Sequence, residues 1–330
     1  MSHRPAIKHC AAITHRPARG AALLVAMVLL TVVATLASGM VWQQWKGVQV
    51  ETSERARAQS GWILQGALDW ARLILREDAR SGRATSLNEP WATPLAEARL
   101  STFLAVDRDN NSDADAGPEA FLAGAISDAQ ARYNLRNLLV DGKVAPAQLV
   151  ILQRLCASAG LGPDSATQLA NGLLASGAAS GAGAANSTAP LPPQQMADLQ
   201  WLGLDAPTID RLAGVLVLLP VRTPVNLNTA PREVLAGVIN GLDLGGADRL
   251  VLARQRQPLR TVEEAGEVLG KGVTLVAGEV DVKSAFFEVR GRLRLDHRVL
   301  TEQTLIERKN GLEVVAVQRQ RQAALLAPPR

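Results

Sequence analysis

The longest run of apolar residues lies near the N-terminus, directly after a short basic stretch. The next charged residue after Arg19 is Lys46, and Ala, Leu and Val make up most of the segment between them. This length and composition are typical of a helix that crosses a hydrocarbon core of about 30 Å. The sequence therefore predicts a transmembrane helix at residues 21–45.

Apolar residues continue at helical spacing beyond this segment. They recur at steps of three and four residues and comprise Ile63, Leu64, Ala67, Leu68, Trp70, Ala71, Ile74 and Leu75. Polar residues occupy the opposite face, so the pattern predicts an amphipathic helix over residues 60–78 that packs on a domain. If the chain is helical throughout, the rod from Ala21 to Asp78 is about 85 Å long at 1.5 Å per residue.

The centre of the chain mixes turn signals with short apolar patterns. Prolines at positions 90, 94 and 118 predict loops and short helices over residues 81–125. The stretch GAISDAQARYNLRNLL predicts a hairpin, with Ile126 on one arm, residues 128–130 near the turn and residues 133–135 on the other arm.

Helical signals then follow one another up to residue 270. Helices are expected from Pro146 and from Pro163, each with its proline in the first turn, and residues 196–219 read as helical again. Further on, one helix starts near Pro231 and ends near residues 240–241, and Gly245-Gly246 opens the next. Thr261 and Glu264 form a capping box for a third.

The end of the chain changes to a period of two. In FFEVRGRLRLD the alternation from Phe287 to Leu295 predicts a half-buried antiparallel strand. The stretch TLIERKNGLEVVAVQRQ predicts two more strands joined at Asn310-Gly311, a strong hairpin signal. We expect these strands to form one sheet with the earlier hairpin.

These patterns predict an α+β fold with a long N-terminal transmembrane and spine helix and a small antiparallel sheet. An all-helical domain of the helix-hairpin-helix or SAM-like kind is inserted in it. The expected boundaries are a leader at 1–20, the transmembrane helix at 21–45, the helix extension with the first strands at 46–140, the helical domain at 141–279 with a flexible Gly, Ala and Ser linker at 175–195, the three-strand tail at 280–320 and a disordered C-terminus at 321–330.

The net charge of +4 comes from the leader alone. Residues 1–20 hold Arg4, Lys8, Arg16 and Arg19 and no acidic residue, and the rest of the chain has 31 basic and 31 acidic residues. Basic residues beside a span favour a cytoplasmic N-terminus. A nucleic-acid partner would need a basic surface on the folded part, so none is expected.

Few residues are suited to catalysis. After the leader, the chain contains one cysteine, Cys156, one histidine, His297, and one tyrosine. A single cysteine cannot form an intrachain disulfide there. One His and one Cys cannot form a four-ligand zinc site and make a Cys-His nucleophile pair improbable. We therefore expect no enzyme. A periplasmic enzyme on an anchor, working through carboxylates, Lys or Ser, is the rival interpretation.

One acidic stretch, DRDNNSDADAGPE, resembles a calcium loop. Its candidate ligands stand at alternate positions: Asp107, Asp109, Asn111 and Asp113. An EF-hand is not predicted, because Ser112 stands where glycine is needed and Pro118 replaces the bidentate glutamate. We expect no cofactor, and calcium at this loop is the one alternative kept open.

A second candidate is a helix-hairpin-helix module for DNA. Gly245 and Gly246 at a helix N-terminus could present N–H groups to a phosphate, with Arg249, Arg254 and Arg256 nearby. However, residues 220–271 hold seven basic and six acidic residues, a weak field for a phosphate backbone. The preferred interpretation is that Asn226 and Asn228 bond the backbone around a turn between packing helices. A membrane-tethered DNA-binding protein of the competence type is the alternative.

Four stretches together resemble a known family. The Arg-Gly pair before AALLVAMVLL is similar to the end of a type IV prepilin leader, and the other three stretches are ISDAQARYNLRNLL, VNLNTAPREVL and SAFFEVRGRLRLD. In this architecture they resemble the K family of minor pseudopilins of type II secretion systems (general secretion pathway protein K, GspK). The resemblance spans roughly residues 19–320 and is weakest at 140–200.

The resemblance implies how the N-terminus is processed. A prepilin peptidase would cut between Gly20 and Ala21, and the span would stay as a single-pass anchor; methylation of Ala21 is left undecided. From the residues alone, an uncut anchor and a secretory signal cut near residues 37–39 stay open. Pilin-like proteins usually carry Glu at the fifth mature position, whereas this chain has Val25 there and no acid in the span. Members of the K family typically lack that Glu and are placed at the pseudopilus tip.

The resemblance also implies partners and location. The chain would lie in the bacterial inner membrane with its bulk in the periplasm. It would assemble at the tip with the minor pseudopilins I and J, with the major pseudopilin and the H subunit as further candidates. It would initiate the pseudopilus that supports export of folded proteins across the outer membrane.

Overall fold

The computed structural model describes residues 19–100, 120–178, 190–270, 272–295, 298–309 and 313–325. The fold is α+β, as the sequence predicts, with a long N-terminal apolar helix and small sheets. The chain divides into two compact units, Met1–Gln59 and Ser60–Arg330.

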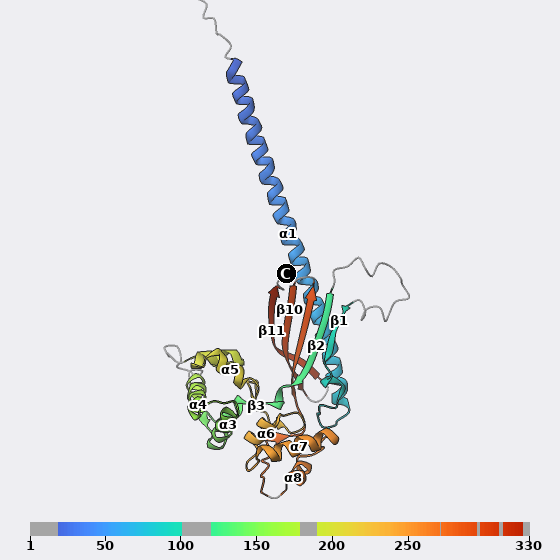
Figure 1. The fold of residues 1–330 in the computed structure, drawn as a ribbon, viewed down its shortest axis with the longest axis vertical. Helices are drawn as coiled ribbons and strands as arrows, with labels where there is room; N and C mark the ends of the chain where they lie inside the picture. Colours follow the sequence, from blue (N-terminus) through green and yellow to red (C-terminus); the bar gives the residue numbers. More distant parts are fainter. Residues whose placement is uncertain are drawn as a thin grey trace, which may run out of the picture. The chain divides into compact units, whose positions relative to one another are not determined.

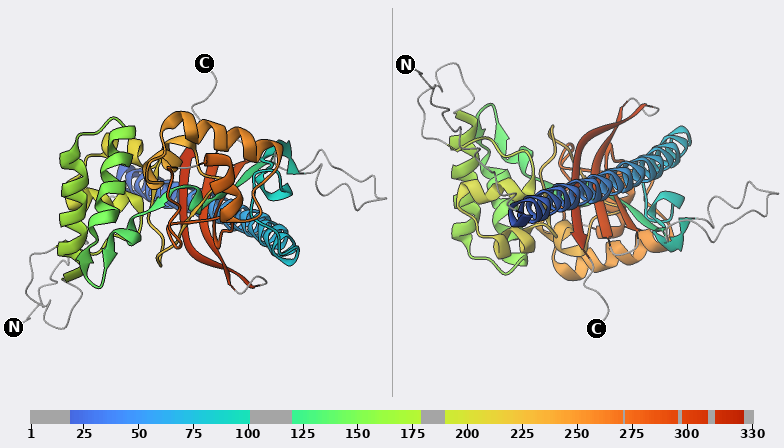
Figure 2. Two further views of the ribbon diagram at one scale, coloured as in Figure 1. Left: turned by 90° about the horizontal axis from the view of Figure 1, so that it is seen from below. Right: turned by 90° about the horizontal axis from the view of Figure 1, so that it is seen from above.

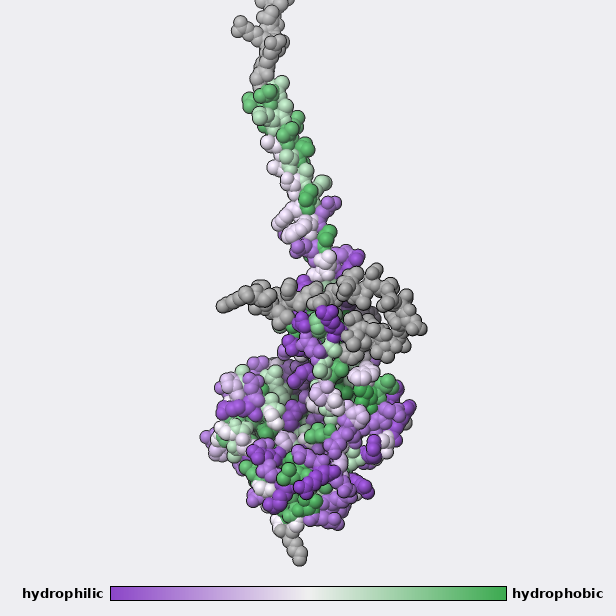
Figure 3. All heavy atoms as spheres, turned by 45° about the vertical axis from the view of Figure 1, so that its right-hand side comes forward, coloured by the Kyte–Doolittle hydropathy of each residue, from purple (hydrophilic) through white to green (hydrophobic). Residues whose placement is uncertain are grey.

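Helix α1, Arg19–Arg80, is unbroken over 62 residues, which corresponds to about 93 Å at 1.5 Å per residue. Its side chains from Ala21 to Val50 are all exposed, and Figure 3 shows the apolar ones in green along this part of the helix. Within the described residues, α1 is the one helix long and apolar enough to cross a membrane. This finding fits a single-pass anchor.

The C-terminal side of the apolar run carries interfacial residues. The Lys46 ammonium nitrogen lies 3.7 Å from the centroid of the Trp42 ring, and Trp45 is next to them. Tryptophan and lysine are enriched where a span leaves the hydrocarbon core. The predicted end of the transmembrane segment near residue 45 is consistent with this position.

One antiparallel sheet forms the second unit's framework. Its strands are β1 (Leu95–Arg99), β2 (Ala120–Asp128), β9 (Phe286–Leu295), β10 (Arg298–Lys309) and β11 (Glu313–Leu325), in the order β1-β2-β9-β10-β11. The three long C-terminal strands form a meander, and β2 pairs with β9 over its whole length. The predicted three-strand tail is therefore confirmed, and Figure 1 shows it in orange and red beside β2.

The end of α1 packs on this sheet with part of the face that the sequence predicts, whereas Trp70 of that face is 55% exposed. Leu64, Leu68, Ala71 and Leu75 are buried, and the last three join Phe287 in one core cluster. Burying each leucine contributes roughly 1.5–3 kcal/mol. A short 3-10 helix, η1 (Pro90–Ala92), adds its tryptophan to this cluster: the ring of Trp91 meets that of Phe287 edge-on at 5.3 Å between centroids.

The insertion between β2 and β9 is mostly helical. Its helices are α3 (Pro146–Ser158), α4 (Pro163–Ala178), η6 (Met196–Leu202), α5 (Ala206–Leu212), α6 (Arg232–Val238), α7 (Leu244–Arg256) and α8 (Val262–Leu269), and its short strand pairs are β3 (Tyr133–Asn134) with β6 (Leu216–Val217), β4 (Leu139–Val140) with β5 (Lys143–Val144), and β7 (Val225–Asn226) with β8 (Val280–Asp281). These elements share one large apolar core. Figures 1 and 2 show α3 and α4 side by side in green, and α6, α7 and α8 as a second group in orange.

The helices of the insertion approach one another closely at a glycine. A Cβ on Gly237 of α6 would lie 2.5 Å from Leu155 Cδ2 of α3. Glycine at this position lets the two helices pack at short distance.

The predicted hairpin at residues 126–135 is wrong. Ile126 does lie in a strand, but β2 pairs with β1, from a stretch expected to hold loops and short helices, and Tyr133-Asn134 pairs in parallel with Leu216-Val217. The reason is the turn residue: Asp128 caps the 3-10 helix η3 (Ala129–Ala131) by accepting from Gln130 N, which directs the chain into the insertion instead of back along β2.

Three other expectations need correction or limits. Strand β11 pairs up to Leu325 with Arg298, so the chain stays ordered five residues beyond the predicted end at 320. The helical signal over 196–219 ends at Leu212, because the following apolar residues form β6. The Asn310-Gly311 turn lies outside the described residues, although Lys309 and Glu313 on either side of it are paired.

The predicted capping box of α8 forms in a shifted way. Thr261 Oγ1 accepts from Glu264 N at 3.4 Å, as expected of an N-cap. The Glu264 carboxylate reaches back to the backbone N–H of Arg260 at 2.8 Å, one residue before the N-cap.

Candidate functional site

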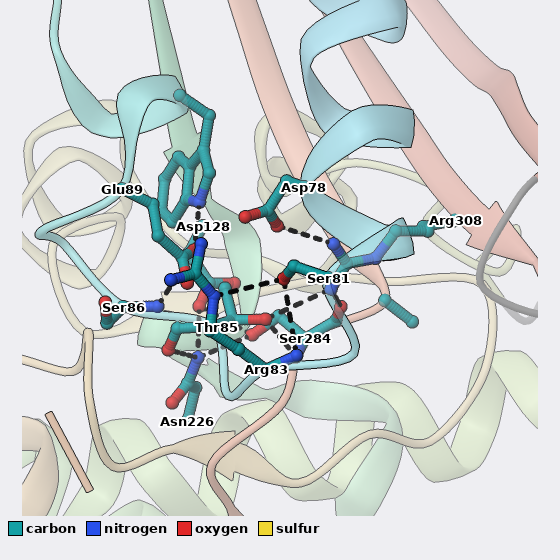
Figure 4. A network of polar contacts seen from close by, with 12 residues as sticks. Asp78, Ser81, Arg83, Thr85, Ser86, Glu89, Asp128, Asn226, Ser284 and Arg308 are labelled. Carbon is teal, nitrogen blue, oxygen red and sulfur yellow. Dashed lines mark hydrogen bonds and ion pairs between the residues drawn. The ribbon is translucent and has the colours of Figure 1, made fainter. Parts of the chain in front are cut away.

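The stretches ISDAQ, VNLNTAP and SAFFEV meet at one buried carboxylate, that of Asp128. Asp128 Oδ2 accepts from Ser284 Oγ at 2.6 Å, from Thr229 Oγ1 at 2.6 Å and from Asn226 Nδ2 at 2.9 Å. The other oxygen accepts from Gln130 N at 2.8 Å. The carboxylate therefore joins the end of β2, the start of β9 and the β7 segment of the insertion (Figure 4).

The environment of Asp128 opposes its ionisation on balance. Burial raises the pKa of its carboxyl above the ordinary value, and the four donors named above lower it in part. The donors stabilise the charged form and hold its oxygens in fixed directions. Such a fully satisfied buried network rigidifies the elements that it connects.

A buried ion pair continues this network to the end of α1. Arg308 of β10 donates to Asp78 at 2.9 Å, to Thr85 Oγ1 at 3.0 Å and to the carbonyl oxygen of Ser284 at 2.7 Å. The side chains of Arg308 and Asp78 are only 10% and 8% exposed. The last turn of α1 is thus fixed to the sheet beside Asp128, as Figure 4 shows.

The loop after α1 is held at the same place. Thr85 N donates to Val282 O at 2.9 Å, and Ser284 N donates to Thr85 Oγ1 at 3.3 Å. Glu89 accepts from Trp91 Nε1 at 2.6 Å and from Ser86 N at 3.2 Å. Burial raises the pKa of Glu89, and these donors lower it in part.

The two asparagines of VNLNTAP bond the backbone, as the preferred interpretation of this segment predicts. Asn226 Oδ1 accepts from Asn228 N at 2.9 Å, which closes a turn. Asn228 exchanges two bonds of 2.9 Å with the backbone of Leu259, after α7. The segment therefore anchors the helices of the insertion onto the Asp128 network, which we call the polar junction: Asp78, Thr85, Asp128, Asn226, Thr229, Ser284 and Arg308.

The helix start at Gly245-Gly246 is already occupied by a side chain of the protein. Gly246 N donates to the N-cap carboxylate of Asp243 at 2.7 Å, where an incoming phosphate would need that donor. A Cβ on Gly246 would meet Leu242 Cδ1 at 2.6 Å, so the glycine also serves packing.

The arginines of the DNA alternative do not converge either. Arg249 and Arg256 are exposed, whereas Arg254 is buried and donates to Leu227 O. Burial lowers the pKa of Arg254 to about 10. The geometry favours the packing role of these helices over the DNA-binding one.

An apolar cavity of about 370 Å³ lies between α1 and the sheet. Small residues form part of its lining, among them Ala67, Gly124 and Gly291. Its one carboxylate, Glu302, is ion-paired with Arg319 at 3.2 Å and with Arg321 at 2.6 Å.

The remaining candidates differ in how much the structure says of them. Gly20, Ala21 and Val25 lie in the first turns of α1. The calcium candidates Asp107, Asp109, Asn111 and Asp113 lie outside the described residues. Among the residues that are described, no group of three or more His, Cys, Asp or Glu side chains could hold a metal ion.

Three comparisons with known proteins agree. The family model described as type II secretion system, protein K, matches residues 225–282, the segment that carries Asn226 and Thr229. The type II secretion system protein K of Pseudomonas aeruginosa is 26% identical over 323 residues, covering 90% of this chain and 91% of that protein. The chain is therefore similar to type II secretion system protein K, both in this segment and over most of its length.

One solved structure is similar to this chain in fold. One chain in the crystal structure of the GspK–GspI–GspJ complex from enterotoxigenic Escherichia coli matches with a TM-score of 0.60 at 19% identity. The match covers 82% of this chain and 98% of that one. The resemblance inferred from the sequence is thereby confirmed.

The sequence alone does not identify the polar junction. Asp78 and Arg308 are 230 positions apart, and nothing local to either predicts the other. The available signal is weak: Asp128, Asn226 and Ser284 are polar residues at the ends of apolar stretches. In the described part of the chain, every buried side-chain nitrogen and oxygen atom has a hydrogen-bond partner, as expected of a structural network.

Proposed function

We propose that this K-family pseudopilin caps the tip of the type II secretion pseudopilus, initiates its assembly and so supports export of folded proteins across the outer membrane. The observation that carries the proposal is helix α1. One unbroken helix provides an exposed apolar part suited to a membrane and a second part that packs on the sheet. The same helix thus supplies both the membrane-suited segment and part of the core of the folded unit.

The N-terminal sequence supports a position above the other subunits. Val25 stands at the fifth position after the proposed cut between Gly20 and Ala21, and no acidic residue lies in the span. An unpaired carboxylate in lipid is costly, and a subunit that never docks beneath another copy has no need of one. We place the span in the inner membrane, with the basic leader in the cytoplasm and the bulk in the periplasm.

We propose the minor pseudopilins I and J as partners. The solved structure with the similar fold is of a GspK–GspI–GspJ complex, and the identity of 26% to a K protein extends over nine-tenths of the chain. The role is proposed to be structural and not enzymatic, because the polar junction is fully bonded and buried.

The test is complementation in the bacterium of origin. A strain without this gene should lose secretion of its type II exoproteins, and the full chain should restore it. Affinity purification of the restored protein from membranes should also recover I and J. Secretion that continues normally without the gene, or a restored protein that recovers neither subunit, would refute the proposal.

A further inference from the structure

The face of the sheet opposite α1 carries a row of arginines. Phe287, Val289 and Leu293 of β9 are buried on the α1 side of the sheet. Residues 288, 290, 292 and 294 therefore point to the other side, since successive side chains of a strand alternate. We call this set the basic row: Arg290, Arg292 and Arg294.

The neighbouring strands do not neutralise the first two members of the basic row. Arg290 lies between Ala125 of β2 and Gln303 of β10, and Arg292 lies between Ala123 and Thr301. Opposite charges on directly facing positions are the usual way in which a sheet stabilises exposed charges. Here all four facing residues are uncharged, and both arginines are exposed.

The nearby carboxylates offer only partial compensation. Glu97 of β1 accepts from Arg294 at 2.8 Å and lies 4.0 Å from Arg292. Glu288, the next residue of β9 on the same side, is bound to Arg132 at 2.6 Å. Among the residues that the structure describes, the three guanidinium groups therefore share the one carboxylate of Glu97.

The surroundings of the basic row suit contact with a protein. The Arg294 guanidinium lies 3.9 Å from the centroid of the Phe121 ring, which gives the row an apolar end. Beside the other two arginines, β2 carries only the small side chains of Ala123 and Ala125. Arginine and aromatic residues together are enriched at protein interfaces.

From this charge pattern we infer that the basic row binds a carboxylate-rich segment of another protein. The row presents guanidinium groups about 7 Å apart, because alternate residues of a strand are separated by two steps of about 3.4 Å. Alternate acidic side chains of an extended segment have the same spacing, and guanidinium–carboxylate pairs form charge-assisted hydrogen bonds. The inference goes beyond the proposed function and does not depend on it.

The test uses the full chain in nanodiscs of phosphatidylcholine and a fluorescent decaglutamate peptide as the probe. The double variant Arg290→Gln/Arg292→Gln should bind the probe about tenfold more weakly than the wild type, because each exposed pair contributes a modest amount. The matched control, Arg249→Gln/Arg256→Gln, removes two exposed arginines of α7 and should bind like the wild type. The basic leader is present in all three proteins and affects them equally.

Two results would overturn the inference. One is equal affinity of the Arg290/Arg292 variant and the wild type, with circular dichroism showing that both are folded. The other is that phosphatidylglycerol vesicles bind through the basic row while decaglutamate does not, which would assign the row to a lipid surface.

Discussion

At the scale of single residues, Asp128 decides how the sheet and the insertion meet. It accepts four hydrogen bonds from three separate parts of the chain. Removing the carboxylate would take this acceptor from Ser284 Oγ, Thr229 Oγ1 and Gln130 N, and a lost acceptor costs about 1–3 kcal/mol. Asn226 Nδ2 would keep Thr85 O and Ser284 Oγ as acceptors. The position therefore tolerates little change.

Replacing Asp128 with asparagine should destabilise the protein by about 1–3 kcal/mol. The reason is that the amide NH2 must face either the donors on Oδ2 or the N–H of Gln130. Denaturant unfolding of the full chain in detergent, followed by near-UV circular dichroism, measures the change. Asp248→Asn, at an exposed ion pair with Arg232, should stay close to the wild type; equal losses in the two variants would contradict the role of Asp128.

The cost of Asp128→Asn should also depend on pH. The folded-state pKa of Asp128 is raised above its unfolded value, so its contribution is fully present below the unfolded pKa of about 3.9 and is lost as pH rises through the folded pKa. The difference in unfolding free energy between wild type and variant should therefore shrink as pH increases from about 4. A difference that grows with pH would show that the donors outweigh burial.

The ion pair between Asp78 and Arg308 is a second contact that variants can test. Asp78→Ala should cost about 3–5 kcal/mol, because it leaves a buried guanidinium without its countercharge. The double variant Asp78→Ala/Arg308→Met should be less damaging than the sum of the two single changes. Glu77→Ala removes an exposed pair with Arg80 and serves as the control; additive losses in the double variant would rule out coupling.

At the scale of elements, the space around two helical glycines shows which of the two lies against another helix. A Cβ on Gly237 would meet Leu155 Cδ2 at 2.5 Å, whereas a Cβ on Gly66 of α1 would meet nothing within 4 Å. Gly237→Ala should therefore destabilise by about 1–3 kcal/mol through overpacking. Gly66→Ala should instead stabilise by up to about 1 kcal/mol through helix propensity. Thermal or denaturant unfolding of the two variants should differ in sign, and a stabilising Gly237→Ala would show that α3 and α6 are not packed so closely.

Elements with a strong local period could be predicted, and those defined by distant partners could not. The helical spacing from Ile63 to Leu75 and the alternation from Phe287 to Leu295 each describe one element by itself. Strand β1 has no such signal, because its five residues, LAEAR, are too few to show a period and include the charged Glu97 and Arg99. The sequence predicts that Tyr133-Asn134 pairs within its own hairpin, because nothing near it indicates the actual partner at Leu216-Val217.

The contacts of the polar junction are of the same two kinds: some follow from the local sequence and others only from the completed fold. The turn bonds of Asn226 and Asn228 follow from side chains that prefer to bond nearby backbone. The convergence of Thr229, Ser284 and Asp128 depends on the completed fold, so the sequence shows only that these residues belong to stretches shared with the K family. The Asp243 cap similarly explains Gly246 only once the helix start is seen in three dimensions.

At the scale of the whole molecule, the proposed function requires that the chain is processed at its N-terminus and keeps its span. Helix α1 begins at Arg19 and continues through Gly20 and Ala21 into the apolar run. A cut between Gly20 and Ala21 would remove the basic leader and leave the complete transmembrane segment on the mature protein. A cut near Gly39 would remove that segment and release the folded part from the membrane.

The most direct measurement is the intact mass of the protein purified from membranes of cells with and without prepilin peptidase. We predict the loss of residues 1–20 only in cells that contain the peptidase, with the protein in the membrane fraction of both kinds of cell. An identical, uncut mass in both cells would contradict processing as a pseudopilin. A mass that corresponds to cleavage near Gly39 would contradict the retained span as well.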